Sequence, residues 1–377
     1  MLYTVGVIIS LFLCVILLTK KDKSQADKIL ALWLLISGVH LFMFNLYITK
    51  QYRQFPYLLG FDLPMPLLHG SFIFLYVTAL TQKERLKAKM ALHFVPYFVG
   101  LCTLHPFFIL PYHDKINTYD NKGAGFEVLL IILFVAIIIS GIGYTLVSLQ
   151  KLYRHKKNIT NLFSNTEKIN LSWLRYLILG SGIIWLLVIF GTDEVIFGAI
   201  VVYVFFIGFF GIKQVGIFTN PTKFVRDKPI IQSIQNNIEE RISTSKKNKY
   251  EKSNLSYSQA DAIYENLTQI MQEEKPFLNP YLGLNDLAEK LQVHPNTLSQ
   301  IINTKEQRNF FDYINRHRIE QFKHEISRPD NQKFTILSIA YDCGFNSKTT
   351  FNRNFKKVTG LSPTQYLKQV KSHLGSS

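Results

Sequence analysis

The sequence LNDLAEKLQVHPNTLSQIINT, at residues 284–304, decides the fold of the C-terminal part, and TILSIAYDCGFNSKTTFNRNFKK, at residues 335–357, repeats its pattern. Each stretch begins with a short apolar helix that carries a small residue, Ala288 or Ala340, where two helices must cross closely. A turn follows, and then a second helix with apolar residues on one face only. The pattern predicts two helix-turn-helix units.

The two units form an internal repeat. Ala340 lies 52 residues after Ala288, whereas Phe351 lies 53 residues after Leu298. We therefore expect one extra residue in the second turn, which Gly344 and Phe345 make in place of Val293.

The helix starts are also marked. Asn285 and Thr335 are the expected caps of the first helix of each unit. Pro295 follows His294 at the first position of the next helix, where a missing N–H costs no hydrogen bond, and Ser347 opens the corresponding helix of the second unit.

A long helix is expected between the units, from Asn309 to Ser327. Its length, about 28 Å at 1.5 Å per residue, would hold two recognition helices close to the roughly 34 Å that separates successive major grooves on one face of DNA. A further helix is expected before the first unit, from Tyr257 to Gln272.

The outward faces of the two second helices carry short, amide or basic side chains suited to the edges of bases. The outward residues are Asn296, Ser299 and Gln300 in the first unit, and Lys348, Thr349, Asn352 and Arg353 in the second. The predicted phosphate contacts, for which a merely solvated charged face is the alternative, are Lys305, Arg308, Lys356 and Lys357.

These motifs fall in the order found in the AraC/XylS-type domain, which residues Pro280 to Lys368 resemble. The matching residues are Leu287-Ala288, Leu298-Ser299, Asn309-Phe310, Tyr313-Ile314-Asn315, Arg318-Ile319, Ile339-Ala340, Gly344-Phe345, Phe351-Asn352-Arg353, Phe355-Lys356, Thr359-Gly360, Ser362-Pro363 and Tyr366. The resemblance implies sequence-specific promoter binding, with the two recognition helices in adjacent major grooves and with base contacts at the seven outward residues named above. RNA polymerase is an expected partner. Gln300 departs from the family, which frequently has Arg there, so the first unit is expected to read adenine or to bind more weakly.

The N-terminal part has a different character. Of the 377 residues, 48% are hydrophobic, and long apolar runs alternate with short charged loops before Gly211. A helix needs about 20 apolar residues to cross a bilayer. Seven segments are predicted to do so: Leu2 to Leu18, Ile29 to Thr49, Leu63 to Leu80, Ala91 to Leu110, Phe126 to Leu149, Leu171 to Phe190, and Val195 to Ile212. The first is expected to be retained, because no cleavage site follows it.

The charges of the loops predict the orientation. The loops after the first, third and fifth segments carry 13 Lys and Arg residues, and the loops after the second, fourth and sixth carry 4. We therefore expect a multi-pass protein of a bacterial inner membrane, with its N-terminus outside and its C-terminal domain in the cytoplasm, where the DNA lies.

Polar side chains collect toward the outer ends of these segments. Either they lie at the interface with water and cap helix ends, or they form a pocket for a small-molecule or envelope signal. The candidates for a sensory pocket are Asp62, His69, His105, Glu127, Asp193 and Glu194, whereas His40 and His93 are expected to be packing or interface residues.

The predicted fold is all-α: a seven-helix transmembrane domain (1–212), a connector (213–256) and an all-helical domain with two helix-turn-helix units (257–377). In the connector, isoleucines recur at helical spacing at positions 231, 234, 238 and 242. This stripe could pair two chains into a homodimer, lie on the membrane, or cover part of the C-terminal domain.

No pattern for a catalytic nucleophile, phosphate-binding loop, metal site or cofactor is found, and the three cysteines do not suit a disulfide framework. We therefore expect a non-enzyme: a one-component sensor that regulates transcription from the membrane, with double-stranded promoter DNA and the lipid bilayer as partners. The alternative is a transmembrane receptor or transporter whose cytoplasmic helical domain docks a protein partner. The net charge of +16 suits both DNA and anionic lipid.

Overall fold

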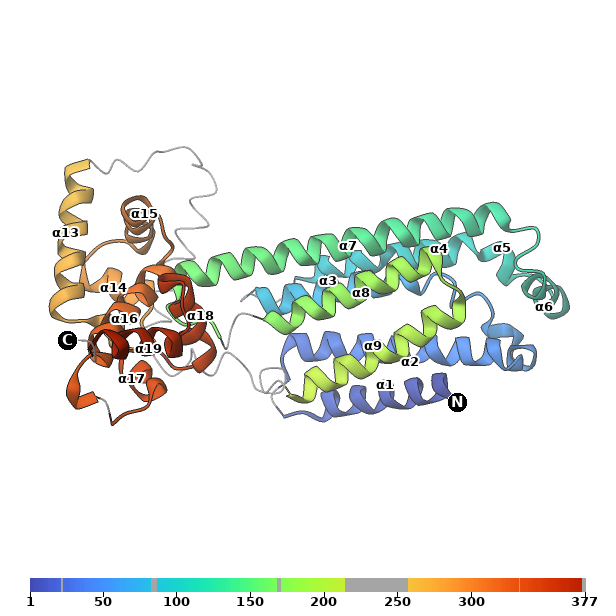
Figure 1. Cartoon of the computed structure of the whole chain (residues 1–377). Helices are drawn as coiled ribbons and strands as arrows, with labels where there is room; N and C mark the ends of the chain where they lie inside the picture. Colours follow the sequence, from blue (N-terminus) through green and yellow to red (C-terminus); the bar gives the residue numbers. More distant parts are fainter. Residues whose placement is uncertain (22, 83–86, 168–170, 214–256, 332, 375–377) are drawn as a thin grey trace. The chain divides into compact units, whose positions relative to one another are not determined.

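The computed structural model describes residues 1–21, 23–82, 87–167, 171–213, 257–331 and 333–374 (Figure 1). Its regular elements in these ranges are helices, as the sequence predicts. The contacts divide the chain into two compact units. The first contains Met1–Arg154 and Leu171–Asp227, and the second contains His155–Asn170 and Lys228–Ser377. The predicted amphipathic helix of the connector lies outside the described residues.

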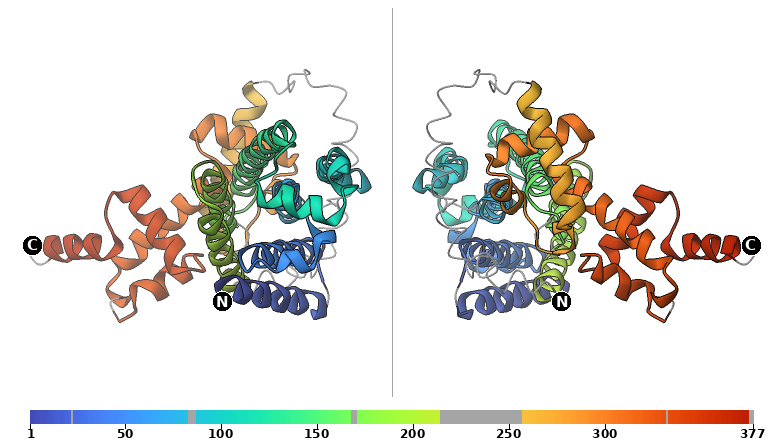
Figure 2. Two further views of the ribbon diagram at one scale, coloured as in Figure 1. Left: turned by 90° about the vertical axis from the view of Figure 1, so that its right-hand side faces the viewer. Right: turned by 90° about the vertical axis from the view of Figure 1, so that its left-hand side faces the viewer.

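The first unit is a bundle of long apolar helices. Helix α1 packs against α2 and α9, and α2 also contacts α3 (Figures 1 and 2). The helices are α1 (Leu2–Thr19), α2 (Gln25–Ile48), α3 (Pro66–Thr81), α4 (Val95–Thr103), α5 (His105–Phe108), α6 (Tyr112–Asp120), α7 (Glu127–Leu162), α8 (Ser172–Phe190) and α9 (Asp193–Lys213), with 3-10 turns η1 (Gln51–Gln54), η2 (Pro56–Leu58) and η3 (Ala88–Phe94). The last residues of α7, from His155 onward, belong to the second unit.

The turn between α1 and α2 is fixed by a capping box. Ser24 Oγ accepts the backbone N–H of Asp27 at 3.1 Å, and the Asp27 carboxylate accepts the backbone N–H of Ser24 at 2.8 Å. Lys20 pairs with the same buried carboxylate at 2.8 Å. The otherwise unpaired amides at the start of α2 are therefore satisfied locally.

Within the described ranges, four helices are long and apolar enough to cross a membrane: α1, α2, α7 and α8. Only 22% of the most apolar window of α7 is buried against other residues, so most of its apolar side chains face outward. Apolar surface of this extent is expected to be covered by lipid or by another protein. Helix α9 covers the seventh predicted span, whereas α3 begins three residues inside the third and, at 16 residues, is shorter than a span.

The prediction of one helix over residues 91–110 is wrong. The chain there forms η3, α4 and α5 in succession. Pro96 and Pro106 are the second residues of α4 and α5, where a proline is tolerated but, because it lacks an N–H, cannot continue a preceding helical turn.

The second unit contains two small hydrophobic cores. One is formed around Leu287, Leu298 and Ile314, and the other around Ile339, Phe351 and Phe355. Helix α16 contributes to both cores. The helices are α13 (Tyr257–Glu273), α14 (Leu284–Lys290), α15 (Pro295–Glu306), α16 (Phe310–Ile326), α17 (Ile336–Asp342), α18 (Lys348–Thr359) and α19 (Pro363–Leu374), with 3-10 turns η4 (Pro276–Leu278) and η5 (Pro329–Asn331).

Candidate nucleic-acid interface

Helices α14 and α15 form the first helix-turn-helix unit. Helix α14 begins two residues earlier than predicted, because the Asp286 carboxylate accepts the backbone N–H of Gly283 at 2.9 Å and makes Gly283 the cap in place of Asn285. Pro295 is the first residue of α15, as predicted, and His294 Nδ1 accepts the backbone N–H of Asn296 at 3.1 Å.

Helices α17 and α18 form the second unit. Thr335 caps α17 by accepting the backbone N–H of Ser338 at 3.1 Å, and Ser347 caps α18 by accepting that of Thr350 at 3.2 Å. The predicted cap at Thr335 and the predicted start of α18 are thus confirmed.

The turns of the two units have the same geometry. Val293 N–H donates to Ala288 O at 3.0 Å, and Phe345 N–H donates to Ala340 O at 3.1 Å, 52 residues further along the chain. The repeat seen in the sequence is therefore a repeat in structure, and the extra residue, Asn346, lies after the turn.

Helix α16 connects the two units. At 17 residues it is about 26 Å long, and Asn309 caps it by accepting the backbone N–H of Asp312 at 2.8 Å. Arg318 in its centre is 1% exposed. Its guanidinium donates to Phe277 O at 2.7 Å and Asn279 O at 2.8 Å, and burial lowers its pKa to about 9.

The predicted base-contacting residues lie on the outer faces of α15 and α18. Six of the seven are exposed: Asn296, Gln300, Lys348, Thr349, Asn352 and Arg353. Ser299 is half-buried, and its backbone carbonyl accepts the amide N–H of Asn303 at 2.8 Å. The Arg353 guanidinium lies 5.8 Å from the ring centroid of Phe311 on α16, a contact that orients it. Both helices therefore present polar side chains to solvent.

A groove of about 230 Å³ between α16 and α18 brings together two predicted phosphate contacts, Arg308 and Lys357. Arg316, which the sequence reasoning missed, lines the same groove. Asp312 also lines it and pairs with Lys357 at 2.7 Å. Glu320 lines it as well, so the groove carries three basic and two acidic side chains, and a phosphate bound there would compete with carboxylates.

The other two predicted phosphate contacts lie elsewhere. Lys305, at the end of α15, pairs with Asp261 on α13. Lys356 is exposed in the last turn of α18. Exposed ion pairs of this kind contribute little to stability, so Lys305 can exchange its carboxylate for a phosphate at low cost.

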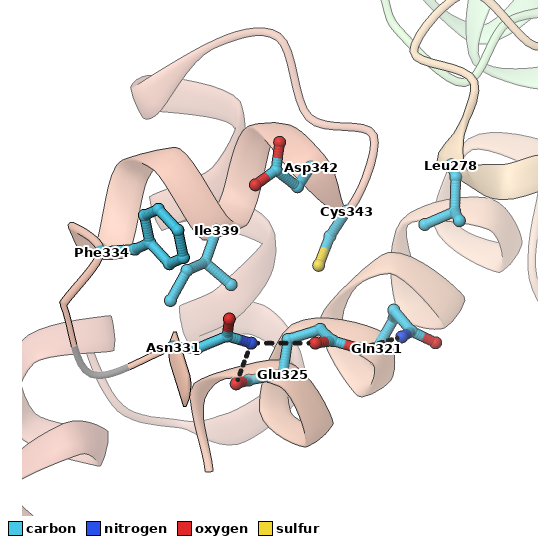
Figure 3. A pocket seen from close by; sticks show the side chains of 8 residues that line it. All are labelled: Leu278, Gln321, Glu325, Asn331, Phe334, Ile339, Asp342 and Cys343. Atoms are coloured by element: carbon cyan, nitrogen blue, oxygen red, sulfur yellow. Dashed lines mark hydrogen bonds between the residues drawn. The ribbon is translucent and has the colours of Figure 1, made fainter. Parts of the chain in front are cut away.

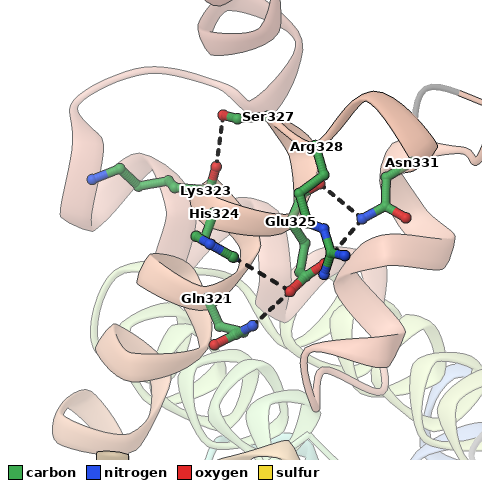
Figure 4. A network of polar contacts seen from close by, with 7 residues as sticks. All are labelled: Gln321, Lys323, His324, Glu325, Ser327, Arg328 and Asn331. Atoms are coloured by element: carbon green, nitrogen blue, oxygen red, sulfur yellow. Dashed lines mark hydrogen bonds and ion pairs between the residues drawn. The ribbon is translucent and has the colours of Figure 1, made fainter.

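The loop between α16 and α17 is held by Glu325 (Figure 4). Its carboxylate accepts hydrogen bonds from Gln321 at 2.8 Å and Asn331 at 3.0 Å, and Arg328 lies 3.4 Å away. Burial acts to raise the pKa of Glu325, but these contacts and His324 together outweigh it and lower the pKa. The network therefore fixes where α17, the first helix of the second helix-turn-helix unit, begins.

Beside this network is a cavity of about 170 Å³. Glu325, Asn331, Phe334 and Cys343 are among its lining residues (Figure 3). Sites for small organic ligands usually have volumes of about 300 to 1,000 Å³. The cavity is smaller than that range and is formed by the residues that position α17.

In the N-terminal helical bundle, the predicted sensory residues lie in several separate places. Tyr119 donates to Asp62 at 3.3 Å. His105, Glu127, Asp193 and Glu194 lie in the first turns of α5, α7 and α9. The described hydrogen bonds join none of the six predicted residues to another.

His69 takes part in a polar chain that the sequence reasoning did not foresee. Trp33 Nε1 donates to His69 Nδ1 at 3.1 Å, and His69 Nε2 lies 3.0 Å from His40 Nδ1. Because His69 Nδ1 accepts, Nε2 carries the proton of the neutral ring and donates to His40. No signal in the sequence pairs His40 with His69, since 29 residues and a 3-10 region separate them.

The C-terminal geometry agrees with comparisons to known proteins. Residues 287–369 match a family described as a helix-turn-helix domain. The melibiose operon regulatory protein of Escherichia coli strain K12 is 34% identical over 87 residues, which are 23% of this chain and 28% of that protein. The uncharacterized HTH-type transcriptional regulator YtdP of Bacillus subtilis is 28% identical over 119 residues, which are 30% of this chain and 15% of that protein.

Among solved structures, the C-terminal domain of AraT, a response regulator from Geobacillus stearothermophilus, is 29% identical and covers 31% of this chain and 88% of its own, with a TM-score of 0.26. The chain spans less than a third of the length of the two curated relatives above. The family match lies in the C-terminal part of the chain, which therefore contains an AraC-type helix-turn-helix domain, and the relatives above are themselves described as regulators.

Proposed function

We propose that this protein is a membrane-bound transcription regulator that binds promoter DNA sequence-specifically, with α15 and α18 in adjacent major grooves. The observation that carries the proposal is the pair of exposed polar faces, Asn296 with Gln300 on α15 and Asn352 with Arg353 on α18, held by one central helix. Amide side chains suit adenine and arginine suits guanine, so the two half-sites should differ in sequence.

The membrane location is supported by two independent features. Helices α1, α2, α7 and α8 have the length and apolar character of spans. The bias of positive charge toward the loops after the odd-numbered segments favours a cytoplasmic location for the C-terminal domain. A regulator anchored in the membrane would receive its signal through the N-terminal helical bundle.

Selection of DNA by the full chain tests the function. The protein, reconstituted in nanodiscs, is incubated with a pool of random duplexes, and the bound sequences are enriched and read. We expect a bipartite sequence with two unlike half-sites about one helical turn apart. Enrichment of no sequence over several rounds would instead favour a domain that docks a protein partner.

We also propose that the N-terminal helical bundle senses the signal. His69, which is hydrogen-bonded to both Trp33 and His40, is proposed to take part in this sensing. His69→Ala should alter the response of a promoter reporter while membrane abundance and DNA affinity remain unchanged. Glu127→Gln, at the start of α7, tests the second predicted residue in the same way. A normal response from both variants would favour packing and helix-capping roles for these residues.

A further inference from the structure

The short segment Phe163–Glu167, which follows α7 directly in the chain, is docked on the DNA-binding domain. It belongs to the second unit, with the helix-turn-helix helices. Phe163 forms an antiparallel bridge with Gly283, the cap of α14. Ser164 donates to Leu282 O twice, from its backbone N–H at 3.3 Å and from Oγ at 2.6 Å. We call this stretch the α7 latch.

The latch satisfies buried polar groups of α16. Asn315 Nδ2 donates to Ser164 O at 3.1 Å. Arg318 Nη1 donates to Ser164 O at 3.3 Å, and Nη2 donates to Ser164 Oγ at 3.1 Å. Ser164 is 0% exposed. A buried guanidinium that lost these acceptors would need water in their place, so the contact is specific.

At its other end, the latch reaches the second recognition helix. One carboxylate oxygen of Glu167, Oε1, accepts hydrogen bonds from the hydroxyls of Ser347 and of Thr350, the latter at 2.8 Å. Ser347 is the cap of α18, and Thr350 lies in its first turn. The positive end of the helix dipole stabilises a negative charge at this position.

We propose that the α7 latch is an autoinhibitory contact, in which Glu167 occupies the N-terminus of α18 and so prevents a phosphate of DNA from binding there. The proposal rests on the proposed function. The N-terminal residues of a recognition helix face the major groove, and Lys348 and Thr349 lie between the two hydroxyls that bind Glu167. A phosphate oxygen and a carboxylate oxygen are both negative acceptors, so they compete for the same donors.

The position of the latch in the chain suggests what releases it. Leu162 is the last residue of α7, and Phe163 follows without an intervening loop. A signal that shifts α7 would therefore pull on Ser164 first. Loss of the Ser164 contacts would free Glu167 from Ser347 and Thr350 and open the N-terminus of α18.

The charge of Glu167 provides the test. The Glu167→Gln chain, in nanodiscs, should bind the duplex enriched by selection about tenfold more tightly than wild type, the effect of one hydrogen bond to a charged group. Glu265→Gln is the matched control, because this exposed residue of α13 loses the same charge outside the latch. It should bind within about twofold of wild type. In a Thr350→Val background, the gain from Glu167→Gln should shrink.

A disulfide gives a second test that preserves Glu167. Residues paired across an antiparallel bridge lie about 4.5 to 5.5 Å apart at Cα, within reach of a disulfide. Gly283 has a φ of −107°, and a Cβ there would meet its nearest atoms at 3.5 Å. Phe163→Cys with Gly283→Cys, in a Cys102→Ser background, should bind DNA more weakly when oxidised than after reduction.

The outcomes separate the latch from the function. Equal DNA affinity of wild type and Glu167→Gln, or of the oxidised and reduced double-cysteine chain, overturns the latch and leaves the regulator intact. Failure of every variant to bind any selected duplex overturns the proposed function and the latch with it.

Discussion

Gln292 and Gly344 occupy the same position in the turns of the two helix-turn-helix units, and both have left-handed backbones, with φ of 54° and 91°. Their surroundings differ. Gln292 is exposed, whereas a Cβ on Gly344 would lie 2.4 Å from Phe277 O and 2.9 Å from Arg318 Nε. The second turn therefore requires glycine twice, for its conformation and for the close approach of η4 and α16, and the first turn does not.

Gly344→Ala should destabilise the C-terminal domain by at least about 3 kcal/mol, because about 1 to 2 kcal/mol of left-handed strain is added to a clash with main chain. Gly360→Ala is the matched control, since Gly360 has a φ of 77° but open space around its Cβ position. Gly360→Ala should lose only the unfolding free energy that corresponds to the left-handed strain. Denaturant-dependent proteolysis of the full chain measures both, and equal losses would refute the close approach.

The DNA-binding domain should lose stability as the pH falls. Burial lowers the pKa of His317, and this effect, which the positive charge of Arg316 reinforces, outweighs the raising effect of Glu306 and Glu320. The unfolded chain then binds a proton near the usual histidine pKa of about 6.5 while the folded chain does not. Protonation below that pH therefore favours unfolding, and the stability is restored as the pH rises above it.

His317→Gln is the control for this titration. Between about pH 7.5 and 5, wild type should lose more unfolding free energy than the variant, as followed by urea denaturation of the domain within the full chain. Parallel curves for the two proteins would show that His317 does not titrate as described.

Two of the basic residues of α18, Arg353 and Lys357, should have separable effects on DNA binding. Arg353→Ala should relax the preference at one base pair of one half-site, with a loss of about 1 to 3 kcal/mol of discrimination. Lys357→Ala should weaken all sequences alike and reduce the salt slope by about one. Competition binding with single-base variants of the site checks both, and an unchanged preference in Arg353→Ala would contradict its assignment.

The proposed topology can be read from reporter fusions. Fusions after Lys89 and Lys157 should behave as cytoplasmic, and fusions after Tyr52 and Lys115 should behave as exported, because positive charge is retained inside. Alkaline phosphatase activity reports export. A cytoplasmic result after Lys115 would contradict the seven-span arrangement.

Local patterns made the C-terminal domain predictable. Helices α13 to α18 can be predicted from apolar periodicity, from helix caps and from Pro295, because each of these signals acts within a few residues. The break between α4 and α5 could have been predicted from Pro106, but apolar composition outweighed it in the sequence reasoning.

Contacts between distant residues were not predictable in the same way. Ser164 is separated from Asn315 by 151 residues, and Glu167 is separated from Thr350 by 183. No periodicity links such pairs, and a lone serine or glutamate after a helix reads as an ordinary solvated loop. The pairing of His40 with His69 was missed for the same reason.

The spacing of the two half-sites tests the central claim most directly. Helix α16 holds α15 and α18 in fixed register, so both can enter major grooves only on one face of the duplex. The measurement is the affinity of the full chain, in nanodiscs, for the selected duplex with and without an insertion of about five base pairs, half a helical turn, between the half-sites. We expect the insertion of about five base pairs to abolish tight binding, because it rotates one half-site to the opposite face of the duplex. An insertion of about ten base pairs should abolish it too, because α16 has a fixed length and cannot span the greater distance. Undiminished affinity for the duplex with the shorter insertion would contradict binding by two recognition helices in adjacent major grooves.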